Sequence, residues 1–270
     1  MLAYAAERVQ GGNAAAGEAA IIEHADVRRM LLIMKALTGG ARALAYETAC
    51  QLDLARGAGD AEAAALAAFL LPIGKALCTD MAVEVASLAI QVHGGHGYIA
   101  EHGVEQLMRD ARITPIYEGT NGIQAIDLVL RKLGRDRGAT FETLVRRIEA
   151  DLARARAVPA VPEIHAALAE SLATLRATTS HILARLTAEA TPDALAGATP
   201  YLRLIGTVAM AWMWLRMSEA AGEDPHGTEI KALARFYALE IVPTAAPLAA
   251  SARAGAAHLY ALEAGQIGRL

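Results

Sequence analysis

The stretch IYEGTNGIQ, residues 116–124, places one carboxylate, Glu118, between an apolar approach and the start of a predicted helix. Thr120 can cap that helix, because its hydroxyl can accept a backbone N–H of the first turn. Apolar residues then recur at helical spacing as far as Gly134, which is a suitable stop. We therefore expect Glu118 just outside a helix N-terminus, on a turn that Gly119 loosens.

Two interpretations of Glu118 follow from this position. In the first it is a positioned base, because Gly119 lets a ligand approach the backbone and free N–H groups at a helix start favour a developing anion. In the second it is an ordinary solvated glutamate before a capped helix. The spacing alone favours the second interpretation, so the first needs support from other parts of the chain.

Two further stretches of the sequence bear on the interpretation of Glu118. Residues 91–124 read QVHGGHGYIAEHGVEQLMRDARITPIYEGTNGIQ, and residues 7–12 read ERVQGG. Together they resemble the C-terminal helical domain of the acyl-CoA dehydrogenases. The segment IIEHADVRRMLL at 21–32, with the long extension after residue 134, is similar to the 3-methylthiopropionyl-CoA dehydrogenase-like subgroup of longer members.

The resemblance implies an FAD-dependent enzyme that desaturates an acyl-CoA thioester between Cα and Cβ. Glu118 would abstract the α-proton, and FAD would accept the β-hydride, because no side chain can accept one. Burial would make the carboxylate a stronger base, and the N–H of Glu118 could stabilise the enolate charge. The expected electron acceptor is an electron-transfer flavoprotein, and the expected assembly is a homodimer or tetramer.

The resemblance also assigns five residues to FAD binding: Arg8, Gln91, Gly94, Gly95 and Thr120. Gln91 and the two glycines end a predicted helix, where exposed N–H groups can approach a diphosphate. A simple helix stop is the alternative. In the family this loop contacts FAD that is bound mainly to a neighbouring subunit.

Arg8 and Thr120 each have a plainer alternative as well. The guanidinium of Arg8 suits a pyrophosphate, but Gly11 stands where the family has an aromatic residue. An exposed arginine at a helix end is equally consistent with the sequence. Thr120 would touch the flavin in the resembled motif, or it is only the helix cap.

The composition predicts an all-α protein, because Ala and Leu dominate and aromatic residues make up 4% of the chain. We expect an antiparallel helical bundle over residues 1–134 and a second helical array over 139–270, separated by the polar segment GRDRG. The expected elements are a loop at 10–20 and helices at 23–56, 60–92, 104–112, 121–133, 141–158, 163–190, 200–221, 225–241 and 247–264.

Two features of the longer helices concern packing. Gly39-Gly40 interrupts a predicted helix and can allow another element to approach closely. An apolar cluster in the second array is predicted to be core, although Trp and Met would also suit a docking face. Its members are Met210, Trp212, Met213, Trp214 and Met217.

Charge, cysteines and hydropathy limit the expected partners. The net charge of −4 provides no bulk attraction to nucleic acid or to a membrane surface. The longest uncharged apolar run, residues 63–73, is too short to span a membrane. Cys50 and Cys78 form no motif, which fits a reduced, cytoplasmic protein. His93 and His96 flank a glycine pair without further ligands, so we expect no metal site.

The first residues suggest what precedes them in the family. Residues 2–8 read as the end of a helix with no start signal, and members of the resembled family carry a helical domain and a β-domain ahead of this point. We therefore expect the C-terminal piece of a longer protein, which by itself binds FAD poorly. The alternative that stays open is a helical interaction or regulatory module that lost catalysis, with nucleic acid as one conceivable partner.

Overall fold

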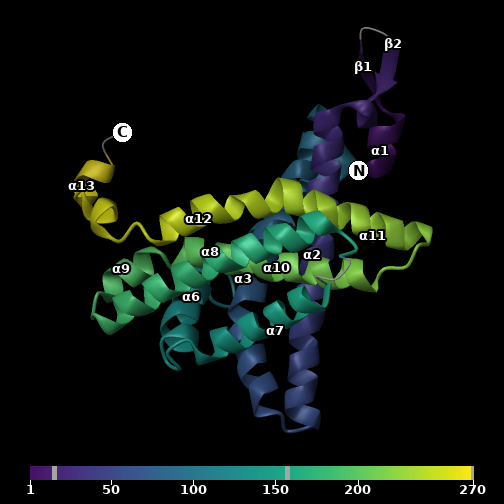
Figure 1. The fold of residues 1–270 in the computed structure, drawn as a ribbon. Coiled ribbons are helices and arrows are strands. Elements are labelled where there is room, and N and C mark those ends of the chain that lie inside the picture. The colour runs from purple at the N-terminus through teal and green to yellow at the C-terminus, as the bar shows by residue number, and fades with distance from the viewer. Residues whose placement is uncertain (14–16, 156–158, 269–270) are drawn as a thin grey trace.

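Two long helices run antiparallel through the N-terminal half of the chain and are joined by a short turn at the bottom of Figure 1. They are α2 (Ala25–Gly57) and α3 (Ala61–His93), and both helices are confirmed where the sequence predicts them. The carboxylate of Asp60 accepts the N–H of Ala63 at 3.0 Å and so caps α3. The structure is a computed structural model that describes residues 1–13, 17–155 and 159–268.

α3 is strongly apolar, and its packing accounts for this. Among the described residues it is the one helix that has the length and composition to cross a membrane. Half of its most apolar window is buried inside the structure, where α2 and α5 (Val104–Arg112) pack against it. The hydropathy of α3 therefore has a structural cause within the helical bundle.

The loop predicted at 10–20 is wrong for its described residues, 10–13 and 17–20, because the segment contributes two short antiparallel strands beside α1 (Leu2–Glu7) at the top of Figure 1. Its strands are β1 (Val9–Asn13) and β2 (Gly17–Ala20), with an irregularity in the register of β1. Gly11 has a φ of +73° there, which is the conformation that a glycine bulge supplies. A bulged, glycine-rich strand lacks the alternating pattern by which strands are recognised.

Short helices lead the chain from α3 back along the bundle. They are α4 (Gly95–Tyr98), η2 (Ala100–His102), α5, α6 (Asn121–Ile126) and η3 (Asp127–Leu133), while another short helix, η1 (Ile21–Glu23), precedes α2. The helix predicted up to residue 133 is confirmed, with its second half in the π-helical conformation. Gly134 is not the left-handed stop, because its φ is −71°. Arg137 and Gly138 turn the chain instead, with φ of +54° and +84°.

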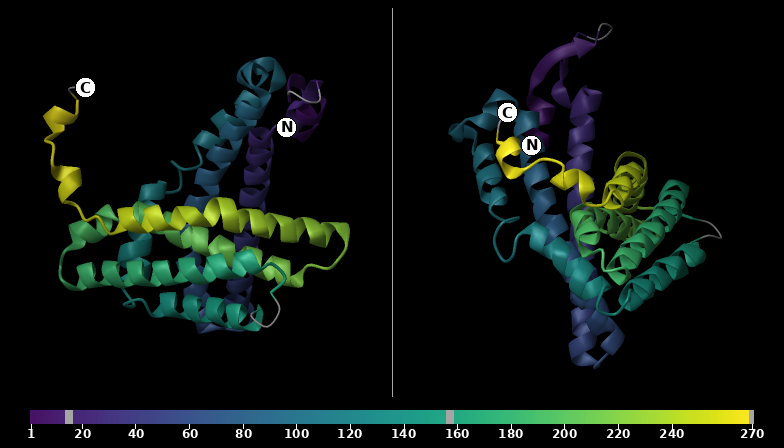
Figure 2. Two further views of the ribbon diagram at one scale, coloured as in Figure 1. Left: turned by 45° about the horizontal axis from the view of Figure 1, so that its top comes forward. Right: turned by 90° about the vertical axis from the view of Figure 1, so that its left-hand side faces the viewer.

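The second array lies across the α2–α3 pair, and Figure 2 shows its long helices side by side. The array confirms the all-α fold class. Its last helix is shorter than the predicted 247–264, because Gly255, at φ +75°, turns the chain. The N–H of Ala256 then bonds to the Asp193 carboxylate at 2.8 Å. The elements are α7 (Ala139–Ala155), α8 (Pro162–Thr187), α9 (Thr191–Ala196), α10 (Ala198–Ala220), α11 (Pro225–Phe236), η4 (Tyr237–Ile241), η5 (Val242–Thr244), α12 (Ala245–Ala252), η6 (Ala257–Tyr260) and α13 (Ala264–Ile267).

The helix α10 is the centre of the array, and one hydrophobic core joins it to α2 and α3. Trp212 and Trp214 are each 2% exposed, and the other apolar residues of the predicted cluster are buried or half-buried. The interpretation of this cluster as core is therefore confirmed. Because the core is continuous, the division into two domains at residues 134–139 stays a prediction.

The glycine pair of α2 lies directly against α10. A Cβ atom on Gly40 would meet Met210 Cε at 2.9 Å and Trp214 Nε1 at 3.0 Å. A Cβ on Gly39 would meet Trp214 Cζ2 at 3.0 Å. A side chain at either glycine would displace Trp214, and one at Gly40 would displace Met210 as well, so the close approach that Gly39-Gly40 predicts is confirmed.

Trp212 and Trp214 should respond differently to the same substitution. Trp212 Nε1 donates to Asp151 Oδ2 at 2.6 Å, whereas Trp214 Nε1 is buried without a partner among the described residues. Both changes to Phe remove similar volume, but only Trp212→Phe removes a hydrogen bond to a carboxylate. It should therefore lower the free energy of unfolding by about 2 kcal/mol more than Trp214→Phe. Urea unfolding of both variants measures the difference, and equal losses would contradict it.

Candidate functional site

Glu118 lies in the turn between α5 and α6, and its backbone has an unusual conformation. Its φ is +57°, which is rare for a residue with a side chain, and Gly119 follows at +80°. Tyr117 N–H donates to the Ile113 carbonyl at 3.2 Å, and Asn121 N–H donates to the Pro115 carbonyl at 3.0 Å. Within the described residues the N–H groups of Glu118 and Gly119 donate to no other group. Two donors at a helix start are thus available to an anion.

The residues around Glu118 fix this turn. Thr120 Oγ1 accepts the N–H of Ile123 at 3.3 Å, so Thr120 is the helix cap that the sequence predicts. Gln124 Nε2 donates to the Glu118 carbonyl at 3.3 Å, which agrees with a structural role for Gln124. The Glu118 side chain itself is exposed. The expected burial of this carboxylate is therefore not provided by the described residues of this chain.

Lys75 and Asn121, which the sequence does not single out, attach this turn to α3 by hydrogen bonds. Lys75 Nζ, on α3, donates to the carbonyls of Thr114 at 3.2 Å and Gly119 at 2.9 Å, and to Asn121 Oδ1 at 3.0 Å. Asn121 Nδ2 also donates to Asp80 Oδ1 at 2.7 Å. The one signal in the sequence is a single lysine within the apolar run of α3.

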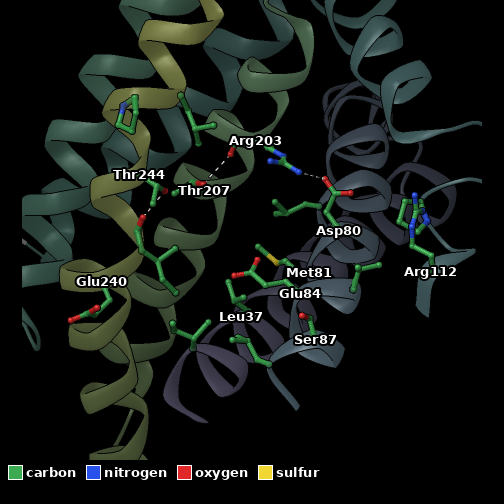
Figure 3. A pocket seen from close by; sticks show the side chains of 18 of the residues that line it. Leu37, Asp80, Met81, Glu84, Ser87, Arg112, Arg203, Thr207, Glu240 and Thr244 are labelled. Carbon is green, nitrogen blue, oxygen red and sulfur yellow. Dashed lines mark hydrogen bonds and ion pairs between the residues drawn. The ribbon is translucent and has the colours of Figure 1, made fainter. Parts of the chain in front are cut away.

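The same network reaches the second array at the edge of a cavity of about 970 Å³. Figure 3 shows Arg203 of α10 pointing to Asp80, and Arg203 Nη2 donates to Asp80 Oδ2 at 3.2 Å. Burial raises the pKa of Glu84 in this cavity, with a smaller increase from Asp80, while Arg203 opposes both. Acidic and basic groups on the cavity wall thus interact with one another.

Gly94, Gly95 and Gly97 follow α3 and form a turn, called the glycine corner below, that has one open side and one packed side. Gly94 has a φ of +57°, and a Cβ on Gly94 or Gly95 would meet no atom of the chain within 4 Å. A Cβ on Gly97 would lie 2.6 Å from the Ile90 carbonyl oxygen, so Gly97 is required for packing. The open glycines are the two that the sequence assigns to FAD. A diphosphate could approach their backbone without displacing a side chain.

Arg8 and Gln91 lie near this glycine corner. Arg8 ends α1, which packs on the end of α3, where Tyr4 Oη donates to the His93 carbonyl at 3.1 Å. Both Arg8 and Gln91 are exposed, and Arg8 forms no ion pair within the part of the chain that the structure describes. Arg8 Nη2 donates a long bond to Gln10 Oε1, at 3.5 Å, and an exposed guanidinium of this kind suits a pyrophosphate.

The predicted site residues therefore form two separate groups. The turn of Glu118 is attached to α3 at Lys75, whereas the glycine corner begins at Gly94, 19 residues further along the chain. At a rise of 1.5 Å per residue, these points are about 28 Å apart along α3. The structure thus places Glu118 and Thr120 at one site, and Arg8, Gln91, Gly94 and Gly95 at another.

The histidines form a stack beside the glycine corner. The rings of His96 and His102 are stacked with centroids 4.6 Å apart, and Tyr4 stacks on His93 at 4.4 Å. In the described ranges, no group of three His, Cys, Asp or Glu side chains is arranged to hold a metal ion. These rings pack the corner against α1.

Comparison with known proteins identifies the class to which this fold belongs. The family model for the acyl-CoA dehydrogenase C-terminal domain matches residues 1–134, and that for the acetyl-CoA dehydrogenase C-terminal-like region matches 144–263. The chain belongs to the acyl-CoA dehydrogenase family.

One similar protein is 3-methylmercaptopropionyl-CoA dehydrogenase of Ruegeria pomeroyi. It is 47% identical over 232 residues, which are 82% of this chain and 39% of the relative. The chain thus spans well under half of that relative's length. This match agrees with the resemblance of the sequence to the 3-methylthiopropionyl-CoA dehydrogenase-like subgroup.

Two solved structures share the fold. A Caenorhabditis elegans protein, ACDH-11 in complex with C11-CoA, has a TM-score of 0.70 at 21% identity, covering 88% of this chain and 38% of its own. A Bacillus anthracis acyl-CoA dehydrogenase complexed with FAD has a TM-score of 0.67 at 18% identity, covering 98% and 46%. At these identities the likeness concerns the fold.

Proposed function

We propose that residues 1–270 form the C-terminal part of an FAD-dependent acyl-CoA dehydrogenase, with Glu118 as the base that removes the α-proton. The observation that carries the proposal is the turn of Glu118 before α6, where Glu118 has a left-handed backbone and two N–H groups have no partner among the described residues. A carboxylate can take the proton, and the N–H groups can stabilise the enolate oxygen that forms.

The residues at the glycine corner fit the diphosphate of FAD. Arg8 offers an exposed guanidinium that forms no ion pair among the described residues, and Gly94 and Gly95 leave their backbone open. Gln91 adds a polar side chain at the same end of α3, and Thr120 lies beside the base. FAD, when bound, supplies the acceptor for the β-hydride.

We further propose that two copies of the chain complete each site. The turn of Glu118 and the glycine corner are about 28 Å apart along α3, so one copy would offer its base to the flavin while the corner of another binds the diphosphate. A homodimer, alone or within a tetramer, meets this requirement. We propose an electron-transfer flavoprotein as the electron acceptor, and the cytoplasm as the location, where Cys50 and Cys78 would stay reduced.

The test uses a protein in which the chain replaces the matched region of the R. pomeroyi relative, called the joined protein below. We expect it to bind FAD and to lose flavin absorbance when 3-methylmercaptopropionyl-CoA or a straight-chain acyl-CoA is added. A flavin-loaded joined protein that no acyl-CoA reduces would contradict the proposed function.

Residues 1–270 by themselves should bind FAD weakly, because they match only 39% of the R. pomeroyi relative and would offer the flavin only part of its contacts. We expect no flavin to remain on residues 1–270 after gel filtration, as measured by absorbance at the flavin bands. Retention of FAD at one per chain would contradict this expectation.

A further inference from the structure

We propose that Lys75 and Asn121 are positioning residues for Glu118, which together hold the turn on α3 in the conformation that proton abstraction needs. The proposal rests on the proposed role of Glu118 as the base. Neither residue is assigned to the reaction by the family resemblance described above. Their hydrogen bonds to the turn are the basis of the proposal.

Lys75 closes the turn from both sides of Glu118. The Thr114 carbonyl precedes Glu118 and the Gly119 carbonyl follows it, and both accept from the same Nζ at 3.2 Å and 2.9 Å. The third bond goes to Asn121 Oδ1 at 3.0 Å. A lysine ammonium has three N–H groups, so all of them are used within the network and none is left for a ligand.

Asn121 fixes the start of α6 to the same helix. Its Nδ2 donates to the Ala76 carbonyl at 3.1 Å and to Asp80 Oδ1 at 2.7 Å, while its Oδ1 accepts from Lys75. Only this orientation of the amide pairs donors with acceptors, because the reverse would place Nδ2 against the ammonium and Oδ1 against Asp80. The side chain is therefore held in one position.

The network also links the turn to the second array. Asp80 accepts from Asn121 with one carboxylate oxygen and from Arg203 of α10 with the other, at 3.2 Å. A residue with a side chain keeps a left-handed φ only where its surroundings enforce it, and Glu118 is such a residue. The bonds from Lys75 and Asn121 are the contacts by which α3 enforces it.

The first test is kinetic and uses the flavin-loaded joined protein. Lys75→Met should slow flavin reduction by acyl-CoA about 100-fold, since an error of about 1 Å in position has an effect of that size. Flavin content and KM for acyl-CoA should stay unchanged, and Lys75→Arg should recover at least about a tenth of the lost rate by restoring donors. The matched control is Lys132→Met, at a lysine that pairs only with Asp127, at 3.9 Å, among the described residues.

The kinetic outcomes separate positioning from a general loss of structure. Reduction at the rate of the unchanged protein in Lys75→Met, or a rise in KM with kcat unchanged, would overturn the proposal. An equal loss in Lys132→Met would overturn it as well. If Lys75→Met does not fold, Asn121→Asp takes its place, because it keeps the shape and sets a carboxylate against Asp80 Oδ1. The same rate loss is then expected.

The second test is hydrogen exchange on residues 1–270, and it does not depend on catalysis. The N–H groups of Tyr117 and Asn121 should exchange at least about tenfold faster in Lys75→Met, because local opening becomes easier. Lys132→Met should leave them unchanged. Unchanged exchange in Lys75→Met would overturn the positioning role. If the joined protein is not reduced by acyl-CoA, the proposed function fails, and the exchange data alone still decide whether Lys75 holds the turn.

Discussion

Glu118→Gln should slow the reduction of flavin by acyl-CoA by about 10²- to 10⁴-fold in the joined protein, because removal of a positioned base has an effect of that size. Glutamine keeps the shape of the side chain but cannot take a proton at neutral pH. The left-handed backbone at residue 118 tolerates Gln as well as Glu, so the turn should keep its structure. Stopped-flow absorbance at the flavin bands measures the rate.

The matched control for this variant is Glu101→Gln, which removes one carboxylate from an exposed residue of η2. The control should reduce flavin at the rate of the unchanged protein, and both variants should retain FAD. If Glu118→Gln also reduces flavin at that rate, Glu118 is not the base. The loss of flavin from Glu118→Gln alone would instead give this residue a role in binding.

Gly40→Leu should lower the free energy of unfolding by about 3 kcal/mol, because it inserts a side chain into a filled contact. A Cβ at this position already meets the side chains of Met210 and Trp214 within 3.0 Å, so the rest of the leucine has no space unless these side chains or α10 move. Gly39 faces the same indole, so Trp214 packs against both glycines. Urea unfolding followed by circular dichroism measures the loss.

Gly74→Leu is the matched control, since Gly74 is also inside a long helix but has open space around its Cβ position. Leucine favours the helix more than glycine does, so this variant should be unchanged or more stable by up to about 1 kcal/mol. Equal destabilisation of both variants would show that the substitution acts through the helix itself. In that case close packing of α10 against Gly40 would not be the cause of the loss.

The sequence alone predicted the helices well, because their signals are local. Asp60 and Thr120 both cap the helices that they precede, as their types indicate. The apolar periodicity also located α2, α3 and α10 to within a few residues. The ends of elements were predicted less well where a glycine changes the chain direction, as at Gly11 and Gly255, because glycine fits a bulge, a turn or a loop equally.

The candidate site was predicted only in part. The resemblance selected Glu118 and the glycine corner, but the spacing of residues along the chain did not reveal that α3 separates them. The roles of Lys75 and Asn121 could not be predicted, because their hydrogen bonds join residues about forty positions apart, and no periodic sequence pattern indicates such contacts. Gly97 was missed because the close approach of the Ile90 carbonyl depends on how the corner folds.

A site shared between two copies is the central claim of this account, and mixing two inactive variants of the joined protein tests it most directly. Glu118→Gln removes the base from one copy, and Gly95→Glu places a carboxylate in the open corner of the other. Random mixing of dimers should restore roughly a quarter of the activity, because half of the dimers then contain one intact site of two. If the mixture stays inactive although mixed dimers form, each site is built within one copy.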